Sequence, residues 1–369
     1  MKTPGLELTY QARGALLRAC EELAAGSTRR SILVPAYHCP SGITPALMAG
    51  LTPVYYRIRR DLSIDYEDLL KKADGDTCVV LVIHFFGIEA DLKPLAALRA
   101  SGVKLIEDWS HSFLQGDLPE LAGGADSDYR LYSFWKLLPS GVGGGLMRSN
   151  ARMEGAREPL VAAPLRQRIV NFKLLLEEAL QHGPRGLARS AFAAIEAVRL
   201  ALKPGQPMPP SARVPSEPVA GEARYPVDRR LAGSAMPPLA RKIIEAYDHA
   251  WVARRRRSNF RRYAELLQSR GPLKLLYASL PDKTCPWVFP VLLEGRDSID
   301  HLWRAQGVAL HTFGIYLHSS LFERTDQATV DDALYLATHL LCLAIHQDVP
   351  EGGIERSADI IQSSLLEHG

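Results

Sequence analysis

The sequence predicts an α/β protein, in which a mostly parallel sheet covered by helices is followed by a small C-terminal α+β domain. Two observations support this fold class. Short β-rich runs alternate with helical segments along residues 12–111, which is the pattern of a parallel, helix-covered sheet. The 369 residues are 47% hydrophobic and 23% charged, so the chain is long and apolar enough to bury a substantial core in two domains.

The alternation begins with a helix. Residues 12–25 have apolar side chains at helical spacing and stop before Gly26, so this helix is expected to begin near Arg13 or Gly14. Ligands bind beyond the carboxyl ends of parallel strands. The later β-rich runs are SILVPAYHC, ALMAGLTPVYYRI, TCVVLVIHFFG and KLIEDWSHS. The candidate site residues are those at the ends of these strands, and they are Tyr37 and His38, residues 85–87 and residues 108–111.

Two domains are expected, a large one at 1–232 and a small one at 233–369. Within the first, residues 151–232 form a variable region of helices and loops, because residues 203–226 are rich in proline and glycine. Residues 236–269 are predicted to form one long helix after Met-Pro-Pro.

Composition excludes several classes of protein. The net charge is +3, and the densest basic run, Arg254–Arg257, is predicted to be the solvated face of a helix, so neither a nucleic-acid nor a membrane partner is indicated. Five scattered cysteines without C-x-x-C pairs suggest neither a zinc site nor a disulfide framework, and no metal is expected. The chain lacks a signal peptide and an apolar span, so a cytoplasmic location is expected.

One lysine stands in an aromatic, apolar run, LYSFWKLLPSGVGGGLM, at residues 131–147. Burying Lys136 between Phe134, Trp135 and Leu137 would favour its neutral amine. A neutral amine can form a Schiff base with an aldehyde. Alternatively, the side chain extends to water from a strand edge, and for a lone lysine this second explanation would be favoured.

An acidic pair decides between these explanations. Glu107 and Asp108 end an apolar run at the expected carboxyl end of a strand, although the aspartate could instead cap a helix. Pyridoxal 5'-phosphate (PLP) requires a lysine for its aldehyde and a carboxylate that keeps its pyridine nitrogen protonated. Lys136 and Asp108 supply this pair, so PLP is the predicted cofactor.

The phosphate of PLP needs hydroxyl and N–H donors. Ser133 and the expected helix start at Arg13, Gly14 and Ala15 can provide them. The glycines that follow Lys136 permit a tight turn and a strand close to a bound ring. They do not form a dinucleotide-binding fingerprint; these glycines are Gly141, Gly143, Gly144 and Gly145.

With these motifs the chain resembles the DegT/DnrJ/StrS family of PLP-dependent aminotransferases. The specific part of the likeness is LIEDWSHS followed by SFWKLLPSGVGGG, and supporting motifs extend from GALLRA to LCLAIHQDV. The resemblance implies PLP-dependent transferase fold type I, with a large domain built on a mostly parallel seven-stranded-type sheet and a small C-terminal α+β domain. It further implies that Lys136 is the Schiff-base lysine and Asp108 the partner of the pyridine nitrogen.

Other roles come from the resemblance alone. His111 matches a ligand of the cofactor's ring oxygen, and Ser133 matches the phosphate-binding serine, although the family places it five residues before the lysine rather than three. Gly14 and Ala15 stand where the family has Gly-Thr, so Arg13 would replace the missing hydroxyl. His38, rather than Cys39, matches the residue stacked on the ring, and His318 matches a substrate-facing histidine.

The family's Asn-x-Arg segment, which reaches the neighbouring subunit's site, aligns with AGSAM, where Ser234 is the only polar residue. The expected function is transfer of an amino group, from glutamate, to a keto group of a nucleotide-linked sugar in polysaccharide or secondary-metabolite biosynthesis. Alternatives are a fold-type-I enzyme with a non-sugar substrate and a non-catalytic PLP-binding regulator. The partners expected are small-molecule substrates and a second copy, giving a homodimer with shared active sites.

Overall fold

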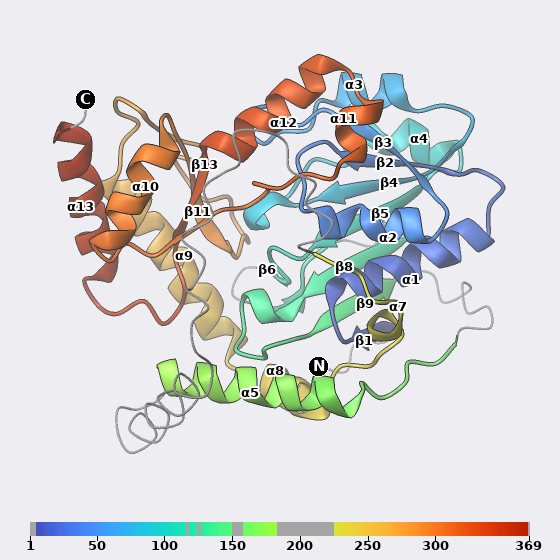
Figure 1. Ribbon diagram of the computed structural model, residues 1–369, viewed down its shortest axis with the longest axis horizontal. Helices are drawn as coiled ribbons and strands as arrows, with labels where there is room; N and C mark the ends of the chain where they lie inside the picture. The colour runs from blue at the N-terminus through green and yellow to red at the C-terminus, as the bar shows by residue number, and fades with distance from the viewer. Residues whose placement is uncertain (1–4, 116–117, 124–126, 150–157, 183–224, 368–369) are drawn as a thin grey trace, which may run out of the picture.

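A seven-stranded sheet forms the centre of the larger part of the molecule (Figure 1). The computed structural model describes residues 5–115, 118–123, 127–149, 158–182 and 225–367. Strand order is β1-β9-β8-β5-β4-β2-β3, and only β9 runs antiparallel to its neighbours. The mostly parallel sheet predicted from the sequence is confirmed. The strands are β1 (Leu6–Thr9), β2 (Ser31–Pro35), β3 (Thr52–Tyr56), β4 (Thr77–Ile83), β5 (Lys104–Trp109), β8 (Tyr129–Ser133) and β9 (Gly144–Arg148).

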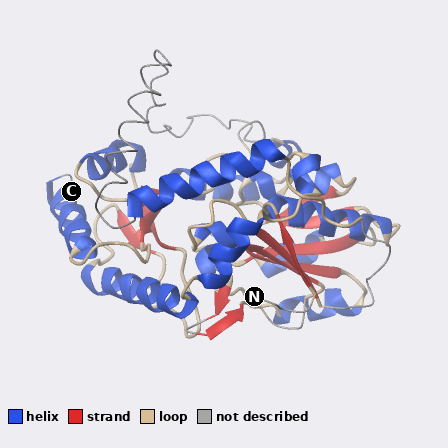
Figure 2. Cartoon of the chain, turned by 90° about the horizontal axis from the view of Figure 1, so that it is seen from below, coloured by secondary structure: helices blue, strands red, loops and turns tan. Residues whose placement is uncertain are grey.

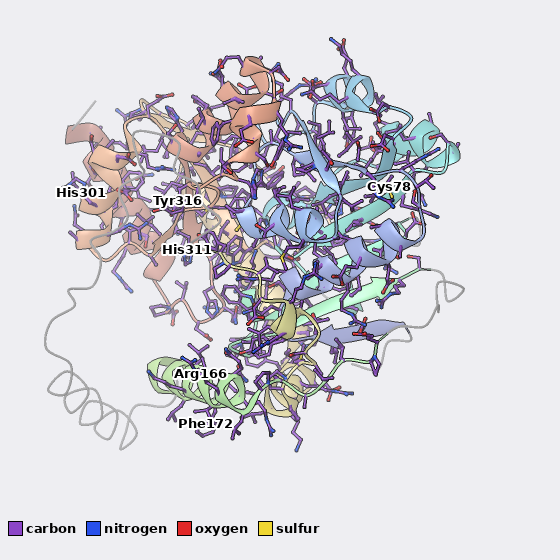
Figure 3. All side chains as sticks on the ribbon, turned by 45° about the vertical axis from the view of Figure 1, so that its right-hand side comes forward. Cys78, Arg166, Phe172, His301, His311 and Tyr316 are labelled. Atoms are coloured by element: carbon purple, nitrogen blue, oxygen red, sulfur yellow. The ribbon has the colours of Figure 1, made fainter. Side chains whose placement is uncertain are left out.

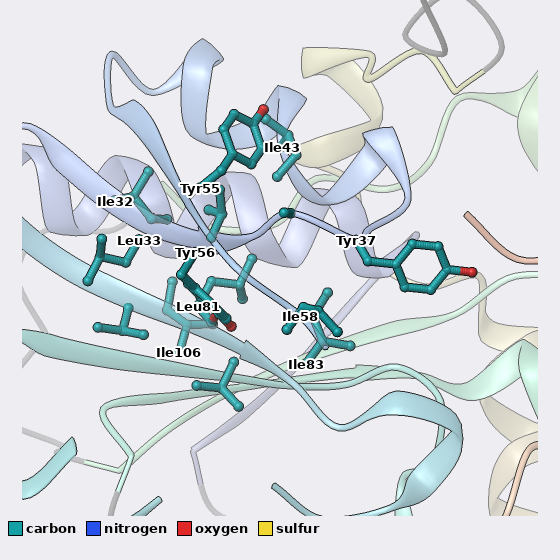
Figure 4. Packing of buried hydrophobic residues seen from close by; sticks show 14 of the residues in the cluster. Ile32, Leu33, Tyr37, Ile43, Tyr55, Tyr56, Ile58, Leu81, Ile83 and Ile106 are labelled. Atoms are coloured by element: carbon teal, nitrogen blue, oxygen red, sulfur yellow. The ribbon is translucent and has the colours of Figure 1, made fainter. Parts of the chain in front are cut away.

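Helices cover this sheet, as the two views in Figures 1 and 2 show. The first helix begins at Ala12, one residue before the expected Arg13. Apolar side chains of the central strands form the main core, and Figure 4 shows Ile32, Tyr56, Leu81 and Ile106 packed together. The helices here are α1 (Ala12–Ala25), α2 (Thr44–Met48), α3 (Tyr66–Lys72) and α4 (Ala96–Ala100).

Within the described residues, the chain then passes through four helices, of which α5 (Leu165–His182) and α8 (Pro238–Ala246) lie along the lower edge of Figure 1. Most of the predicted variable region, residues 183–224 included, lies outside the described residues. The single helix predicted over 236–269 is wrong, because the Asp248 carboxylate accepts a hydrogen bond from Trp251 N–H and caps a new helix. The helices are α5 (Leu165–His182), α7 (Arg229–Ala232), α8 (Pro238–Ala246) and α9 (His249–Leu266).

A second, four-stranded antiparallel sheet of order β10-β11-β13-β12 matches the expected α+β part. α9 contributes Val252 to the core of the first part and Phe260 to the core of the second. The predicted division at 232/233 stays a prediction. The elements are β10 (Leu273–Leu275), β11 (Val288–Leu293), α10 (Arg296–Ala305), β12 (Leu310–His311), α11 (Ser320–Arg324), α12 (Gln327–His339), β13 (Leu340–Ala344) and α13 (Gly353–Glu367); a separate hairpin joins β6 (Leu114–Gln115) and β7 (Leu118–Leu121).

Half of the basic run on α9 is buried, whereas Arg254 is exposed and Arg255 is partly exposed. Arg256 and Arg257 are 1% and 8% exposed. Arg257 Nη1 donates to the Thr284 carbonyl at 2.6 Å, and Arg256 also donates inside the protein. The expectation of a solvated face is therefore wrong for Arg256 and Arg257, because their hydrogen-bond acceptors come from segments distant in sequence. None of the helices in the described ranges has the length and hydropathy needed to span a bilayer.

The segment after β12, in the second part of the molecule, makes hydrogen bonds to side chains of the first part. Tyr37 extends away from the core cluster in Figure 4, and its hydroxyl donates to the Phe313 carbonyl at 2.5 Å. Its ring occupies the space beside Gly314, where a Cβ atom would approach the ring to 2.4 Å. The Tyr55 hydroxyl pairs with Ser320 at 2.7 Å. These contacts hold residues 312–316 over the carboxyl ends of the central strands.

The close approach of α1 to β9 requires glycine at position 144. A Cβ atom there would lie 2.3–2.6 Å from backbone atoms of Gln11 and Ala12. We expect Gly144→Ala to lower the free energy of unfolding by about 1–3 kcal/mol, measured by urea denaturation. Gly75→Ala is the control, because no atom lies within 4 Å of its added Cβ. Equal stability of the two variants would contradict the close approach.

Candidate active site

A cavity of about 390 Å³ lies beyond the carboxyl ends of β4, β5 and β8. It is closed on one side by the first turn of α1 and on another by residues 312–316, which include Tyr316 (Figure 3). The cavity brings together five of the predicted site residues, and these are Arg13, Asp108, His111, Ser133 and Lys136. Its size is within the range usual for small-molecule sites.

Lys136 ends a short 3-10 helix, Phe134–Lys136, that directly follows β8. The turn after it returns to the sheet because Gly141 and Gly143 have φ values of +67° and +139°, and the Gly143 carbonyl accepts from Phe134 N–H at 3.0 Å. Burial lowers the pKa of Lys136 to about 8, while the nearby charge of Asp108 opposes the shift. Near neutral pH, roughly a tenth of such amines are uncharged.

Asp108 lies near the end of β5, beside Ile83 of β4 and Leu131 of β8. Its Oδ1 atom accepts a hydrogen bond from Ser110 N–H at 2.7 Å. Among the described elements no helix begins here, so Asp108 is not a helix cap. The carboxylate lines the same cavity as Lys136 and retains acceptor capacity for a protonated nitrogen.

His111 is held in one tautomer. Its Nδ1 atom accepts a hydrogen bond from Phe86 N–H at 3.1 Å, so the proton of the neutral ring is on Nε2. Burial, and next the charge of Lys136, place the pKa of His111 well below its ordinary value of 6.5. The ring stacks on Phe86 and Trp287, with centroids 5.4 and 4.7 Å away. The neutral His111 ring therefore presents its Nε2–H group as a hydrogen-bond donor at the cavity wall.

At the other end of the cavity, the first turn of α1 brings Gln11, Ala12 and Arg13 near Ser133. Burial lowers the pKa of Arg13, whose Nη1 atom donates to the Pro226 carbonyl at 2.9 Å. α1 has no side-chain cap and no acidic residue in its first turn. Backbone N–H groups and a guanidinium at a helix start form a setting suited to an oxyanion.

Two predicted phosphate ligands face elsewhere. A Cβ atom on Gly14 would lie 2.8 Å from Cα of Ala232, so Gly14 allows α1 to pack against the end of α7. Ala15 is fully buried in the main core. Neither residue lines the cavity, because the turn of the helix directs both away from it.

The two predicted histidines at positions 38 and 318 are also outside the cavity. His38 Nδ1 contacts the Pro35 carbonyl at 3.0 Å, and its Nε2 accepts from His318 N–H at 3.1 Å. His318 Nδ1 in turn contacts Ser320 Oγ at 2.9 Å. The histidines therefore join the segment after β12 to the end of β2, and Cys39 lines the cavity instead of His38.

Several lining residues were not found from the sequence. Trp287 precedes β11, Tyr225 precedes α7, and Thr312 to Tyr316 follow β12. Nothing in their spacing relates them to Lys136, because they reach the cavity only through the packing of the two parts. Trp135 also lines the cavity and is 49% exposed.

Ser234 does not project from the surface in the manner of a residue reaching a neighbouring subunit. It is fully buried, and its hydroxyl donates to the Arg230 carbonyl at 2.8 Å. Ser234 therefore serves packing within the chain.

The comparisons with known proteins agree with this geometry. Residues 9–157 match the sequence model of the DegT/DnrJ/EryC1/StrS aminotransferase family. This match confirms the resemblance, and it covers Lys136, Asp108 and the first turn of α1. The family's members are PLP-dependent aminotransferases. Among curated proteins no match was found.

Solved structures show the same fold over the full chain. The aminotransferase TlmJ from Streptoalloteichus hindustanus is 19% identical, with a TM-score of 0.67 over 99% of this chain and 86% of its own. PseC from Helicobacter pylori, an aminotransferase of pseudoaminic acid biosynthesis, is 14% identical (TM-score 0.65, 98% and 87% covered). The sugar aminotransferase CalS13 from Micromonospora echinospora is 16% identical (0.63, 98% and 87%). Fold type I is therefore confirmed.

Behind Asp108 lies a buried acid that sequence analysis did not assign. Glu107 accepts hydrogen bonds from His84 Nε2 at 2.9 Å and Trp109 Nε1 at 3.1 Å. Ala90 N–H donates to His84 Nδ1, and the His84 ring stacks on Trp109 with centroids 3.7 Å apart. Burial alone would raise the pKa of Glu107, but these partners lower it below its ordinary 4.5.

This shift has a testable consequence for stability. Because the folded-state pKa of Glu107 is depressed, its contribution is present above pH 4.5 and is lost as the pH falls through the folded pKa. We expect Glu107→Gln to lower the free energy of unfolding at neutral pH by about 1–3 kcal/mol and to flatten its acid dependence. Urea denaturation across that pH range measures both effects, with the exposed Glu89→Gln as control. An unaltered acid dependence would contradict the assignment.

Proposed function

We propose that this protein is a working PLP-dependent aminotransferase, which transfers an amino group from glutamate to a keto group of a nucleotide-linked sugar. One observation supports this most strongly. Lys136, with a pKa lowered to about 8, and Asp108 line one cavity at adjacent strand ends. The family match supports the same reaction class.

The residues present suit PLP as a cofactor. Asp108 would accept from the protonated pyridine nitrogen, and Lys136 would join the aldehyde. His111 would donate from Nε2 to the ring oxygen, because its Nδ1 atom is already occupied. Arg13, Ser133 and the first turn of α1 would hold the phosphate. Spr1654 from Streptococcus pneumoniae, with 14% identity and the same fold, is described in PLP and PMP forms.

When bound, PLP supplies an aldehyde and a ring able to accept the electrons of a carbanion. The residues of this chain move and hold the protons. Nζ of Lys136, once free, can accept the proton from the donor's Cα and return it later, since its lowered pKa allows both states near neutral pH. The Asp108 carboxylate keeps the ring nitrogen cationic, which makes the ring a better electron acceptor.

The nature of the acceptor is supported by the neighbours and by the cavity wall. CalS13 is a sugar aminotransferase with the same fold. Trp135, Tyr225 and Tyr316 line the cavity and offer aromatic faces with few charges. A second candidate, an acceptor other than a sugar, is favoured by the buried Ser234, because the Asn-x-Arg function of the family has no equivalent in that segment.

The proposal is tested by colour and turnover. Protein supplied with PLP should turn yellow, and glutamate should bleach the visible band to the pyridoxamine form. Lys136→Ala should abolish the band. Asp108→Asn should retain colour but bleach about 100- to 1,000-fold more slowly, since the ring nitrogen loses its stabilising charge.

The outcomes separate the alternatives. Colour without bleaching by any amino donor would favour the non-catalytic regulator and overturn the aminotransferase. After bleaching, keto-sugar nucleotides and simple ketones can be compared for their ability to restore the yellow form. Recovery with non-sugar ketones alone would favour the second candidate.

We also propose a homodimer in the cytoplasm, with the active sites shared between the subunits. The exposed side of α5 offers a contact surface. Its apolar side chains recur at helical spacing and are 43–69% exposed, and they are Leu165, Ile169, Phe172 and Leu176. Figure 3 shows Phe172 and Arg166 on this helix, at an edge of the molecule.

We expect the double substitution Ile169→Glu and Phe172→Glu to dissociate the dimer, because it would bury charges in the contact. Sedimentation equilibrium measures the change. Leu366→Glu is the control, since Leu366 is 62% exposed on α13, at another place in the fold. A double variant that still sediments as a dimer would exclude this surface, and an active monomeric wild type would exclude the homodimer.

A further inference from the structure

We propose that Trp287 is a positioning residue for Lys136, whose indole face holds the amine whenever that amine is free of the cofactor. A buried pair, Arg256 and Gln347, holds the indole at a constant distance from the turn that contains Lys136 and Leu137, called the lysine turn below. The inference deepens the proposed function and rests on it for the catalytic role of Lys136.

The contact itself is a cation–π arrangement. Nζ of Lys136 lies over the Trp287 ring, 4.5 Å from its centroid. Indole is the aromatic side chain that attracts a cation most strongly. The ring also stacks on His111, with centroids 4.7 Å apart and planes 29° apart. Trp287 therefore contacts both the amine and the histidine assigned to the cofactor's ring oxygen.

The backbone of Trp287 is held on both sides. Its N–H group donates to the Phe86 carbonyl at 3.0 Å, and its carbonyl accepts from Arg256 Nη1 at 2.8 Å. The Phe86 N–H group is the one that holds His111 Nδ1. Thus a hydrogen bond joins the loop before β11 to the turn after β4, next to Lys136 and His111.

Arg256 connects this loop with the lysine turn. Its Nε atom donates to Gln347 Oε1 at 2.8 Å, and Gln347 Nε2 donates to the carbonyl of Leu137 at 3.0 Å. Leu137 is the residue after Lys136. Arg256 and Gln347 are each 1% exposed, and burial lowers the pKa of Arg256 to about 10. Burying a guanidinium is costly, so its bonds to both sides of the cation–π contact indicate a positioning role.

The indole favours the charged state of Lys136, whereas burial favours the neutral one. The other groups that bear on the amine are Asp108 and Cys39, which raise its pKa, and Arg13, which lowers it. His111 also lies close enough to interact with its charge. A proton accepted by Nζ would thus stay above the indole, within the cavity, until it is returned.

The test uses cofactor-free protein, so its result is independent of whether the aminotransferase proposal holds. Lysines are reductively methylated with ¹³C-formaldehyde, and the Lys136 resonance is identified by its loss in Lys136→Arg. Its pKa is then measured by NMR titration. We expect Trp287→Leu to lower it by about half a unit to one unit, and Trp287→Phe by less.

An isosteric version preserves the packing. The chain has five tryptophans. Replacing them all with 5-fluorotryptophan weakens the ring's negative face and should lower the pKa of Lys136 by a few tenths of a unit. The same labelling in Trp287→Phe protein should have no effect, which excludes the neighbouring Trp135. An unchanged or raised pKa in the fluorinated wild type would overturn the proposal, even if Trp287→Leu failed to fold.

The positioning role of Arg256 and Gln347 has its own test in the enzyme supplied with PLP. Gln347→Leu leaves the indole intact but removes the bond to Leu137, so we expect kcat to fall about 10-fold with the KM for the donor within 2-fold. Gln362→Leu is the matched control, because Gln362 donates to the Leu266 carbonyl at the surface. If Gln347→Leu, like the Gln362→Leu control, leaves both kcat and the pKa of Lys136 unchanged, then Arg256 and Gln347 have only a structural role.

Discussion

The proposed chemistry depends on one electrostatic constraint: the Lys136 amine must be buried enough to lose its proton and yet remain beside the negative charge of Asp108. Burial lowers the pKa of the amine, whereas the carboxylate raises it and favours the charged form. The two effects together place the pKa of the amine at about 8. The cavity wall, the glycine turn and the first turn of α1 are arranged around this pair.

Parallel topology is what makes the pairing possible. Asp108 is opposite Leu131 in the β5–β8 register, so the strand that carries the aspartate lies next to the strand that leads to Lys136. The antiparallel β9 then returns past α1, where only glycine at position 144 fits. The second part of the chain completes the cavity with Trp287 and residues 312–316. Its position is held by contacts of Tyr37 and Tyr55, both buried side chains of the first part.

Where chemistry and chain order coincide, the predicted site residues do lie together in one cavity, and their roles stay predictions. Lys136, Asp108, His111 and Ser133 lie on, or just after, neighbouring strands, so local spacing was enough to bring them together. The two predicted histidines lie outside the cavity lining, because a motif gives the place of a residue along the chain but not the direction of its side chain. His38 follows β2 as expected, yet its ring turns into the protein and accepts from His318 N–H, while Cys39 faces the cavity.

By itself the sequence determined the fold class, the β-rich runs and the lysine–aspartate pair, because these follow from periodicity and from the charge of single residues. Only the tertiary structure decided which side chains surround the pair. Trp287 and the buried Arg256 are more than 110 positions from Lys136, and the bond that joins them ends on a backbone carbonyl, which carries no trace in a sequence. Burial and hydrogen bonding between distant segments therefore give Arg256 a place beside the site that the basic run in the sequence did not indicate.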